Sequence, residues 1–229
     1  MRTVICWKTT VVLIMLLMAI TGCNGTAQIV GGKRVPLLFE ADFENSDTGN
    51  FKATDPDAWR IEPGNDGKVL ALHKQSEYEP QVRSPVNINL IRNVFVGSFM
   101  LELKMRSTTK DYGHRDLCLF FGYQDPTHFY YVHIANQSDA HANSIFIVDA
   151  EPRVSIAETR TTGTKWDEDW HTVKLKHDAE NGTIEVFFDD NPEPIMTAVN
   201  DRFNWGGVGI GSFDDTGQFD DIKLWGIEK

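Results

Sequence analysis

The feature of this chain that most constrains its fold is an alternation of apolar and polar residues that recurs along most of its length. In SFMLELKMRS, Leu101, Leu103 and Met105 alternate with Glu102 and Lys104. Successive side chains of a β-strand point to opposite faces, so this period of two predicts a strand with one buried face. HTVKLKHD, GTIEVFFDD, GVGIGSF and FDDIKLWGI follow the same pattern. No window combines a helical apolar stripe with helix caps.

Turn signals divide these segments at intervals of about eight to twelve residues. Asn181-Gly182 lies between two strand patterns, and Asn-Gly is a strong signal for a two-residue hairpin turn. Turn-forming residues also cluster in EPGNDG, YQDP, DDNPEP and DDTG. We therefore predict one all-β domain over residues 37–229, folded as an antiparallel two-sheet β-sandwich, a jelly roll.

The first part of the chain has a different character. Residues 1–22 have a positively charged start and the apolar run VVLIMLLMAI, which is too short to span a bilayer but suits a signal peptide. The following ITGC resembles a bacterial lipobox, which implies that Cys23 is diacylated and that the protein is a lipoprotein. Asn24 would then be the second residue of the mature chain. By the enteric sorting rule for lipoproteins, a residue other than Asp at this position indicates the outer membrane of the cell envelope, facing the periplasm or the cell surface. Residues 23–36 are interpreted as a tether, and the alternative is an ordinary secretory signal.

Charge and cysteine content narrow the choice of partners. Without Arg2 and Lys8, which leave with the signal peptide, 20 basic residues stand against 33 acidic ones, a net charge of −13. Such a surface repels nucleic acid and anionic lipid, so we expect no nucleic-acid partner and membrane contact only through the lipid on Cys23. Cys6 also leaves, so Cys118 has no partner for an intrachain disulfide, and its apolar neighbours predict a buried small side chain.

The order of several segments carries a family resemblance. LLFEADFE, FVGSFMLELKMRS, DLCLFFGYQDPTHFYYVHIA, WHTVKLKHDAENGTIEVFFDD and GGVGIGSFDDTGQFDDIKLWG follow one another in residues 37–229. This order resembles the concanavalin A-like lectin/glucanase superfamily. It is similar in particular to laminin-G-like domains and to the 3-keto-disaccharide hydrolase domain family. The resemblance implies a concave sheet that holds sugar, with the first and last strands paired on the opposite sheet.

Three carboxylates follow each other at two-residue spacing in the first strand pattern, at Glu40, Asp42 and Glu44. Family 16 glucanases of the same superfamily carry E-x-D-x-E as their catalytic motif, but on a strand in the middle of the domain. Here Phe39 and Phe43 alternate with the acids, as expected for a strand with one buried face and one solvent-exposed face. We therefore interpret the acids as a solvent-facing row rather than as a catalytic site.

The first and last strands also supply the candidates for a metal site. Members of this superfamily often hold a Ca²⁺ ion where these strands meet. The resemblance therefore makes Asp42 and Asp221 candidate ligands of a structural Ca²⁺. Calcium requires six to eight oxygen ligands, and no fixed spacing of acids supports such a set in this sequence. Solvated surface acids are the favoured interpretation, and no other cofactor is indicated.

Candidate sugar-binding residues come from the middle strands and one loop. In HFYYVHIAN the alternation places Tyr131 and His133 opposite Tyr130, so that they face outward if Tyr130 faces the core. Arg106 is expected beside them on a neighbouring strand, and Trp166 at an exposed rim. Aromatic rings suit the C–H faces of sugars, and Arg and His suit their polar groups. The alternative is cross-strand packing of these aromatics in the core.

These observations favour a surface-tethered lipoprotein whose β-sandwich binds an oligo- or polysaccharide. The alternative is a glycan-degrading enzyme, either a glycoside hydrolase such as a 3-keto-disaccharide hydrolase or a polysaccharide lyase. In a lyase, Tyr131 or His133 would remove a proton beside a uronate carboxylate that Arg106 neutralises. The third hypothesis is a structural surface protein without a sugar ligand. No matched acid pair or metal triad in the sequence assigns an enzymatic activity.

The lipid anchor makes a direct prediction. Replacing Cys23 with Ser removes the thiol that would carry the lipid, so the Cys23→Ser protein should move from the membrane fraction to the soluble fraction. Partitioning between detergent and aqueous phases measures the change. A Cys118→Ser protein is the control and should stay with the membrane; unchanged partitioning of Cys23→Ser would contradict the lipoprotein assignment.

Overall fold

The computed structural model describes residues 27–229, and the structural statements below concern these residues. The predicted signal peptide, Cys23 and Asn24 lie outside them. The described chain consists of β-strands, turns and one short 3-10 helix, η1 (Pro56–Ala58). Its strand pairs are antiparallel, which confirms the predicted all-β class. Within this part of the chain, no helix has the length and hydropathy of a membrane span.

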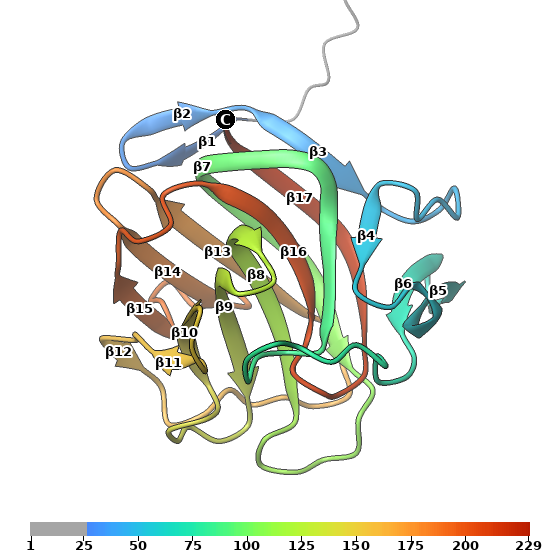
Figure 1. Ribbon diagram of the computed structural model, residues 1–229. Helices are drawn as coiled ribbons and strands as arrows, with labels where there is room; N and C mark the ends of the chain where they lie inside the picture. The colour runs from blue at the N-terminus through green and yellow to red at the C-terminus, as the bar shows by residue number, and fades with distance from the viewer. Residues whose placement is uncertain (1–26) are drawn as a thin grey trace, which may run out of the picture.

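The first of two packed layers, called sheet I here, is a curled antiparallel sheet at the front of Figure 1. Its strands are, in spatial order, β11 (Val154–Ser155), β10 (Ser144–Asp149), β9 (His128–Ala135), β8 (Asp116–Asp125), β16 (Gly206–Ser212), the first part of β7 (Asn87–Ser107) and β4 (Phe51–Ala53).

The second layer, sheet II, lies behind it (Figure 1). Its strands are β12 (Thr159–Arg160), β15 (Met196–Val199), β14 (Thr183–Phe188), β13 (His171–Asp178), the second part of β7 and β17 (Gly217–Glu228), with β3 (Leu37–Ala41) and β6 (Lys68–Leu72) both beside β17 and β5 (Trp59–Pro63) beside β6. The first long strand, β3, therefore pairs with the last strand of the chain, as the resemblance implies.

The strand β7 belongs to both sheets. Residues 87–96 pair with β16, and residues 99–105 pair with β13. Between the two parts the backbone of Asn93 takes a positive φ of 60°, a conformation that Asn tolerates better than most residues, and the strand turns sharply there (Figure 1). One continuous strand thus closes the sandwich at this edge.

The main hydrophobic core fills the space between the sheets. From sheet I, Tyr130 and Val132 point inward, and from sheet II they meet a layer that includes Leu101, Leu103 and Leu175. These side chains are almost completely buried. The alternation predicted from the sequence is therefore confirmed in both layers, and the structure decides that Tyr130 is on the inward side of β9.

A hairpin of β1 (Gln28–Val30) and β2 (Lys33–Val35) precedes β3. The structure differs here from the sequence interpretation, which assigned these residues to the tether. Val30 and Val35 bury their side chains against Met100 and Trp225 on the outer side of sheet II. Because these two valines bury apolar surface against sheet II, the segment packs on the sandwich as a hairpin.

The outer face of sheet I carries a second apolar cluster. Phe120, Phe129, Tyr131 and Phe146 pack on one another there, with Tyr131 and Phe146 stacked at a ring-centroid distance of 5.1 Å. The segment of residues 73–86, which crosses the lower front of the sheet in Figure 1, covers part of this cluster. It is held by backbone hydrogen bonds, for example from the Val86 N–H to the Phe213 carbonyl at 3.0 Å.

One histidine lies inside the main core. The His177 ring is 1% exposed and packs edge-on against Phe99 and Phe121, with centroid distances of 5.7 and 5.4 Å. Burial lowers the pKa of His177 from 6.5 to about 4. Its Nε2 has no hydrogen-bond partner among the described residues, and the charge of Asp178 and a hydrogen bond with the Gly97 backbone offset only part of the effect of burial.

This core histidine predicts a pH dependence of stability. The unfolded chain binds a proton at His177 near pH 6.5 and the folded chain only near pH 4, so stability should fall as the pH falls through this window. Between pH 7 and 4.5 the contribution is about 2–3 kcal/mol. Urea unfolding of the protein and of His177→Leu measures it. The variant should lose that much less stability over the window, and equal losses would contradict the assignment.

Candidate functional site

The outer face of sheet I is open at its upper part, where a pocket of about 400 Å³ lies beyond the covering segment. We call it the Tyr78–Tyr123 pocket. It is lined by residues of β4, β7, the end of β8 and the segment 73–86: Lys52, Ala53, Thr54, Tyr78, Ile88, Leu90, Tyr123, Gln124, Asp125 and Pro126. The volume is in the range of small-ligand sites in proteins, about 300–1,000 Å³.

Aromatic and aliphatic side chains form the floor of this pocket. Tyr123 is half-buried and stacks on Phe129, with a centroid distance of 5.2 Å and an interplanar angle of 26°. The stacking fixes the plane of the Tyr123 ring. Ile88 and Leu90 continue the apolar floor along β7. Burial raises the pKa of both Tyr78 and Tyr123, so their hydroxyl groups stay protonated.

Polar groups stand at the rim. Asp125 Oδ1 accepts hydrogen bonds from the Thr127 N–H at 2.7 Å and from its hydroxyl at 2.8 Å. Burial raises the pKa of Asp125, but these bonds and the His128 ring outweigh it, so the pKa lies below the ordinary value and the carboxylate is ionised. Lys52 and Gln124 are exposed beside it. The pocket thus offers a flat apolar floor with a fixed acceptor and two flexible donors.

The predicted ligand residues Tyr131 and His133 lie on the outer face of sheet I, opposite Tyr130, so the face was predicted correctly. Their exposure was not, since Tyr131 is 0% and His133 3% exposed. The Tyr131 hydroxyl accepts a hydrogen bond of 2.7 Å from Arg153, whose guanidinium lies 4.1 Å from the Phe213 ring centroid. Arg153 and the segment 73–86 cover this part of the face. The alternation in the sequence does not show that these residues cover it.

Arg106 does not lie beside these residues. It is at the end of β7, after the strand has passed into sheet II, and it hydrogen-bonds to Gln218 of β17. Its guanidinium lies 5.0 Å from the centroid of the Trp170 ring. The expected neighbourhood of Arg106 and Tyr131 is wrong because the bend in β7 moves Arg106 to the other sheet.

The exposed rim position expected for Trp166 is also wrong. Trp166 is 6% exposed, its Nε1–H donates to the Ile134 carbonyl at 3.0 Å, and its ring packs edge-on against Phe188. Trp170 is half-buried and lines a surface pocket beside Lys104. The loop between them carries no strand pattern, so its sequence does not show which indole is inside.

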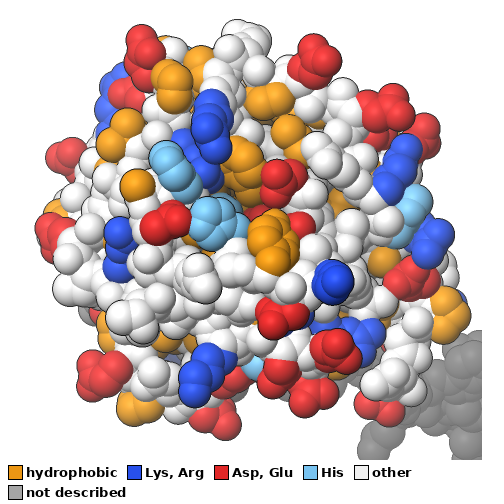
Figure 2. Space-filling model, turned by 90° about the horizontal axis from the view of Figure 1, so that it is seen from below, with side chains coloured by type: hydrophobic (Ala, Val, Ile, Leu, Met, Phe, Trp, Pro, Cys, Tyr) orange, Lys and Arg blue, Asp and Glu red, His pale blue; other side chains and the backbone are white. Residues whose placement is uncertain are grey.

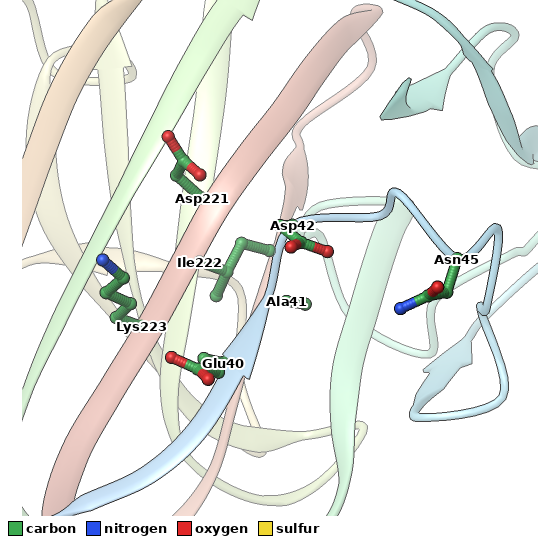
Figure 3. Close-up of a pocket in the computed structure, with 7 residues that line it drawn as sticks. All are labelled: Glu40, Ala41, Asp42, Asn45, Asp221, Ile222 and Lys223. Atoms are coloured by element: carbon green, nitrogen blue, oxygen red, sulfur yellow. The ribbon is translucent and has the colours of Figure 1, made fainter. Parts of the chain in front are cut away.

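The calcium candidates Asp42 and Asp221 line one pocket between β3 and β17, together with Glu40, Ala41, Asn45, Ile222 and Lys223 (Figure 3). Their side chains diverge there, with Asp42 turned towards Asn45 and Asp221 to the far side of β17 (Figure 3). Asp221 pairs with Lys104 at 2.7 Å, and Asp42 Oδ1 accepts from the Glu44 N–H at 3.2 Å. The structural Ca²⁺ remains a prediction.

The three acids of the first strand pattern do not share a face along their whole length. Glu40 lies on β3, whereas the chain turns at Phe43, which has a positive φ of 57°. Beyond this turn, Glu44 Oε1 accepts a hydrogen bond from the Lys68 N–H at 2.9 Å. All three carboxylates are exposed and belong to the side of sheet II, away from the Tyr78–Tyr123 pocket.

The residues that form the Tyr78–Tyr123 pocket were missed in the sequence. Tyr78 lies in EYEP, a segment without strand alternation, and Tyr123 stands directly before the turn YQDP. For Tyr123 the sequence did contain a signal of a strand position, because the residues that precede it, LCLFFG, are mostly apolar and aromatic. Nothing in the sequence pairs it with Tyr78, which reaches the pocket from the covering segment.

No protein-family model and no curated protein matches this sequence. Solved structures do match. The carbohydrate-binding module CBM66 from Bacillus subtilis has 17% identity, covers 77% of this chain and 95% of its own, and gives a TM-score of 0.54. Domain 4 of AbnA, a GH43 extracellular arabinanase from Geobacillus stearothermophilus, in complex with arabinotriose, has 15% identity, covers 86% and 95%, and gives 0.55.

A third similar structure is the winged bean acidic lectin in complex with methyl-α-D-galactose, with 13% identity, coverage of 83% of this chain and 99% of the lectin, and a TM-score of 0.56. At these identities the likeness concerns the fold. The chain has the jelly-roll β-sandwich that these lectins and carbohydrate-binding modules share, which confirms the predicted fold class.

The exposed acids of the first strand yield a prediction. Because Glu40 and Glu44 lie on the other sheet from the pocket, Glu40→Gln and Glu44→Gln should change neither glycan binding nor any glycan turnover. The free energy of unfolding should change by about 0.5 kcal/mol or less, since a Gln oxygen can still accept the Lys68 N–H. Calorimetric binding assays and urea unfolding measure both quantities. Loss of turnover with intact stability would instead identify catalytic acids.

Proposed function

We propose that this protein binds carbohydrate in the Tyr78–Tyr123 pocket and that it works at the bacterial cell envelope, held by a lipid on Cys23. One observation carries the proposal: a tyrosine-lined pocket with a polar rim lies on the outer face of sheet I in a lectin-like jelly roll. The ligand class is an oligo- or polysaccharide.

The chemistry of the pocket supports this ligand class. A sugar ring presents flat patches of C–H groups, which pack on an aromatic face, and hydroxyl groups, which need donors and acceptors around the edge. The fixed Tyr123 ring offers the face, and Asp125 offers the acceptor. The ionised Asp125 and the net charge of −11 favour a neutral glycan over an acidic one.

The similar structures support the same class. One is itself a carbohydrate-binding module, and two others are complexes with arabinotriose and with methyl-α-D-galactose. The particular sugars bound in those structures are not transferred to this chain, whose proposed ligand class rests on its own pocket.

Binding is a better match for the pocket than glycan degradation. Most glycoside hydrolases use a pair of carboxyl groups on either side of the bond that is cleaved. Asp125 is the single acid among the described residues that line the pocket. A lyase needs a base, and burial raises the pKa of Tyr123, which opposes the formation of a phenolate.

The envelope location is supported by the sequence. The short apolar run in residues 1–22 and the ITGC motif that ends at Cys23 match a lipoprotein signal. The acidic surface does not favour binding to anionic lipid, so attachment depends on the acyl chains.

The pocket predicts the effect of removing its aromatic floor. After a glycan array has identified a ligand, Tyr123→Ala should weaken binding about tenfold or more, about 1.4 kcal/mol, because the stacking surface is lost. Tyr123→Phe keeps the ring and should retain most of the affinity. Isothermal titration calorimetry measures the affinities, and thermal melting confirms that both variants are folded.

Arg106→Ala and Trp170→Ala are the matched controls, because their stacked side chains form an alternative aromatic surface on sheet II. Both should bind like the unchanged protein. If binding is lost in these variants and kept in Tyr123→Ala, the ligand lies on sheet II and the proposed pocket is wrong. Release of cleaved products from the bound glycan would favour the enzymatic alternative.

A further inference from the structure

A cluster of ligand-type side chains is buried at the lower end of sheet I, away from the Tyr78–Tyr123 pocket. Cys118 of β8 and His133 of β9 are direct register partners, and Asp116 precedes Cys118 by two residues on the same face of β8. Asp116 and Cys118 are 0% exposed and His133 3%. One carboxylate, one thiol and one imidazole therefore converge on the outer face of the sheet, with ligand atoms within 4.8 Å of one another.

The two distances from Asp116 in this cluster are close to the edges of a tetrahedral metal site. Asp116 Oδ2 lies 3.2 Å from Cys118 Sγ and 3.7 Å from His133 Nε2. Around a zinc ion, bond lengths of about 2.1 Å to O and N and about 2.3 Å to S give ligand–ligand distances of about 3.4–3.6 Å at tetrahedral angles. Small side-chain adjustments would place all three ligands on one ion.

A second observation points to a missing partner. Asp116 Oδ1 is buried and accepts no hydrogen bond from any described residue. Oδ2, in contrast, accepts hydrogen bonds from the Phe213 N–H at 2.7 Å and from the Cys118 S–H at 3.2 Å, which fix the carboxylate in place. A buried carboxylate oxygen without a hydrogen bond is costly unless a cation or a donor meets it.

We propose that Asp116, Cys118 and His133 form a site for a divalent metal ion of the zinc type. Mixed oxygen, sulfur and nitrogen ligands suit Zn²⁺, and three protein ligands leave a fourth position open. The site is separate from the proposed sugar pocket, and the proposal does not depend on that function.

The charges balance when the ion is bound. One carboxylate, one thiolate and one neutral imidazole around a dication carry no net charge, which suits a buried position. The thiol proton of Cys118 leaves to solvent when the ion binds.

Coordination has two local costs. The hydrogen bond from the Cys118 S–H to Asp116 Oδ2 is lost with the thiol proton. His133 Nδ1 accepts a long hydrogen bond of 3.4 Å from the Asn143 N–H. Binding through Nε2 requires the ring proton on Nδ1, so this weak contact would be given up. The three new metal–ligand bonds outweigh these two weak hydrogen bonds.

The neighbouring acids do not offer a better site. Asp116 also groups with Asp214, which is exposed, and with Asp215. Asp215 Oδ2 already accepts from the Tyr112 hydroxyl at 2.8 Å and from the Asp116 N–H at 2.9 Å. At this end of the molecule, seen in Figure 2, histidine, acidic, basic and apolar side chains lie around a recess in the surface.

The test uses the full chain with Cys6→Ser and Cys23→Ser, which leaves Cys118 as the only thiol. After treatment with a chelator, the protein is titrated with Zn²⁺ against a chromophoric chelator, and with Co²⁺ in the absorption spectrometer. We expect one ion per chain, a thiolate-to-Co²⁺ charge-transfer band and a rise in Tm with Zn²⁺. Failure to bind Zn²⁺ at micromolar concentrations would overturn the proposal.

The variants separate the two groups of ligands. Cys118→Ala and His133→Gln should each lower Zn²⁺ affinity at least tenfold, and Cys118→Ala should abolish the charge-transfer band. Asp214→Asn should keep both. Circular dichroism confirms that each variant is folded, and His177→Leu controls for the loss of an unrelated buried histidine. Affinity that depends on Asp214 and not on Cys118 would show an oxygen-ligand site instead and would overturn the assignment.

Discussion

The architecture depends on one strand that belongs to two sheets. The first part of β7 pairs with β16, and the second part pairs with β13 and β17. Because the two parts are covalently continuous through the bend at Asn93, the sheets are held face to face at this edge, and their apolar sides must meet. The main core, the position of the last strand and the pairing of β3 with β17 all follow from this arrangement.

The outer face of sheet I raises a second requirement. It carries a continuous group of aromatic side chains, and such a surface is unfavourable in water unless something covers it. The segment 73–86 and Arg153 cover the lower part, and Arg153 lies between the rings of Phe146 and Phe213. Only the upper part stays open, and there the aromatic surface becomes the floor of the Tyr78–Tyr123 pocket. The covering segment therefore decides where a ligand can reach the sheet.

The candidate residues show what alternation can and cannot predict. The alternation in β9 correctly placed Tyr131 and His133 on the opposite face from Tyr130, because successive side chains of a strand alternate, but it left open which face is the core. Alternation gives no information on what covers a face, and Tyr131 proved to be buried. Arg106 was misplaced for a related reason, since its position depends on a bend about a dozen residues earlier in the same strand.

The sequence by itself determined the fold class, the hairpin around Asn181-Gly182 and the buried face of strands with clear alternation, such as β13. Those properties depend on side-chain periodicity and turn chemistry, which are local along the chain. The tertiary structure alone decided that Tyr78 meets Tyr123, and that Asp116 and Cys118 meet His133 in a dry interior. These contacts depend on strand register and on the path of a loop without periodicity, which are fixed by the packing of the whole sandwich.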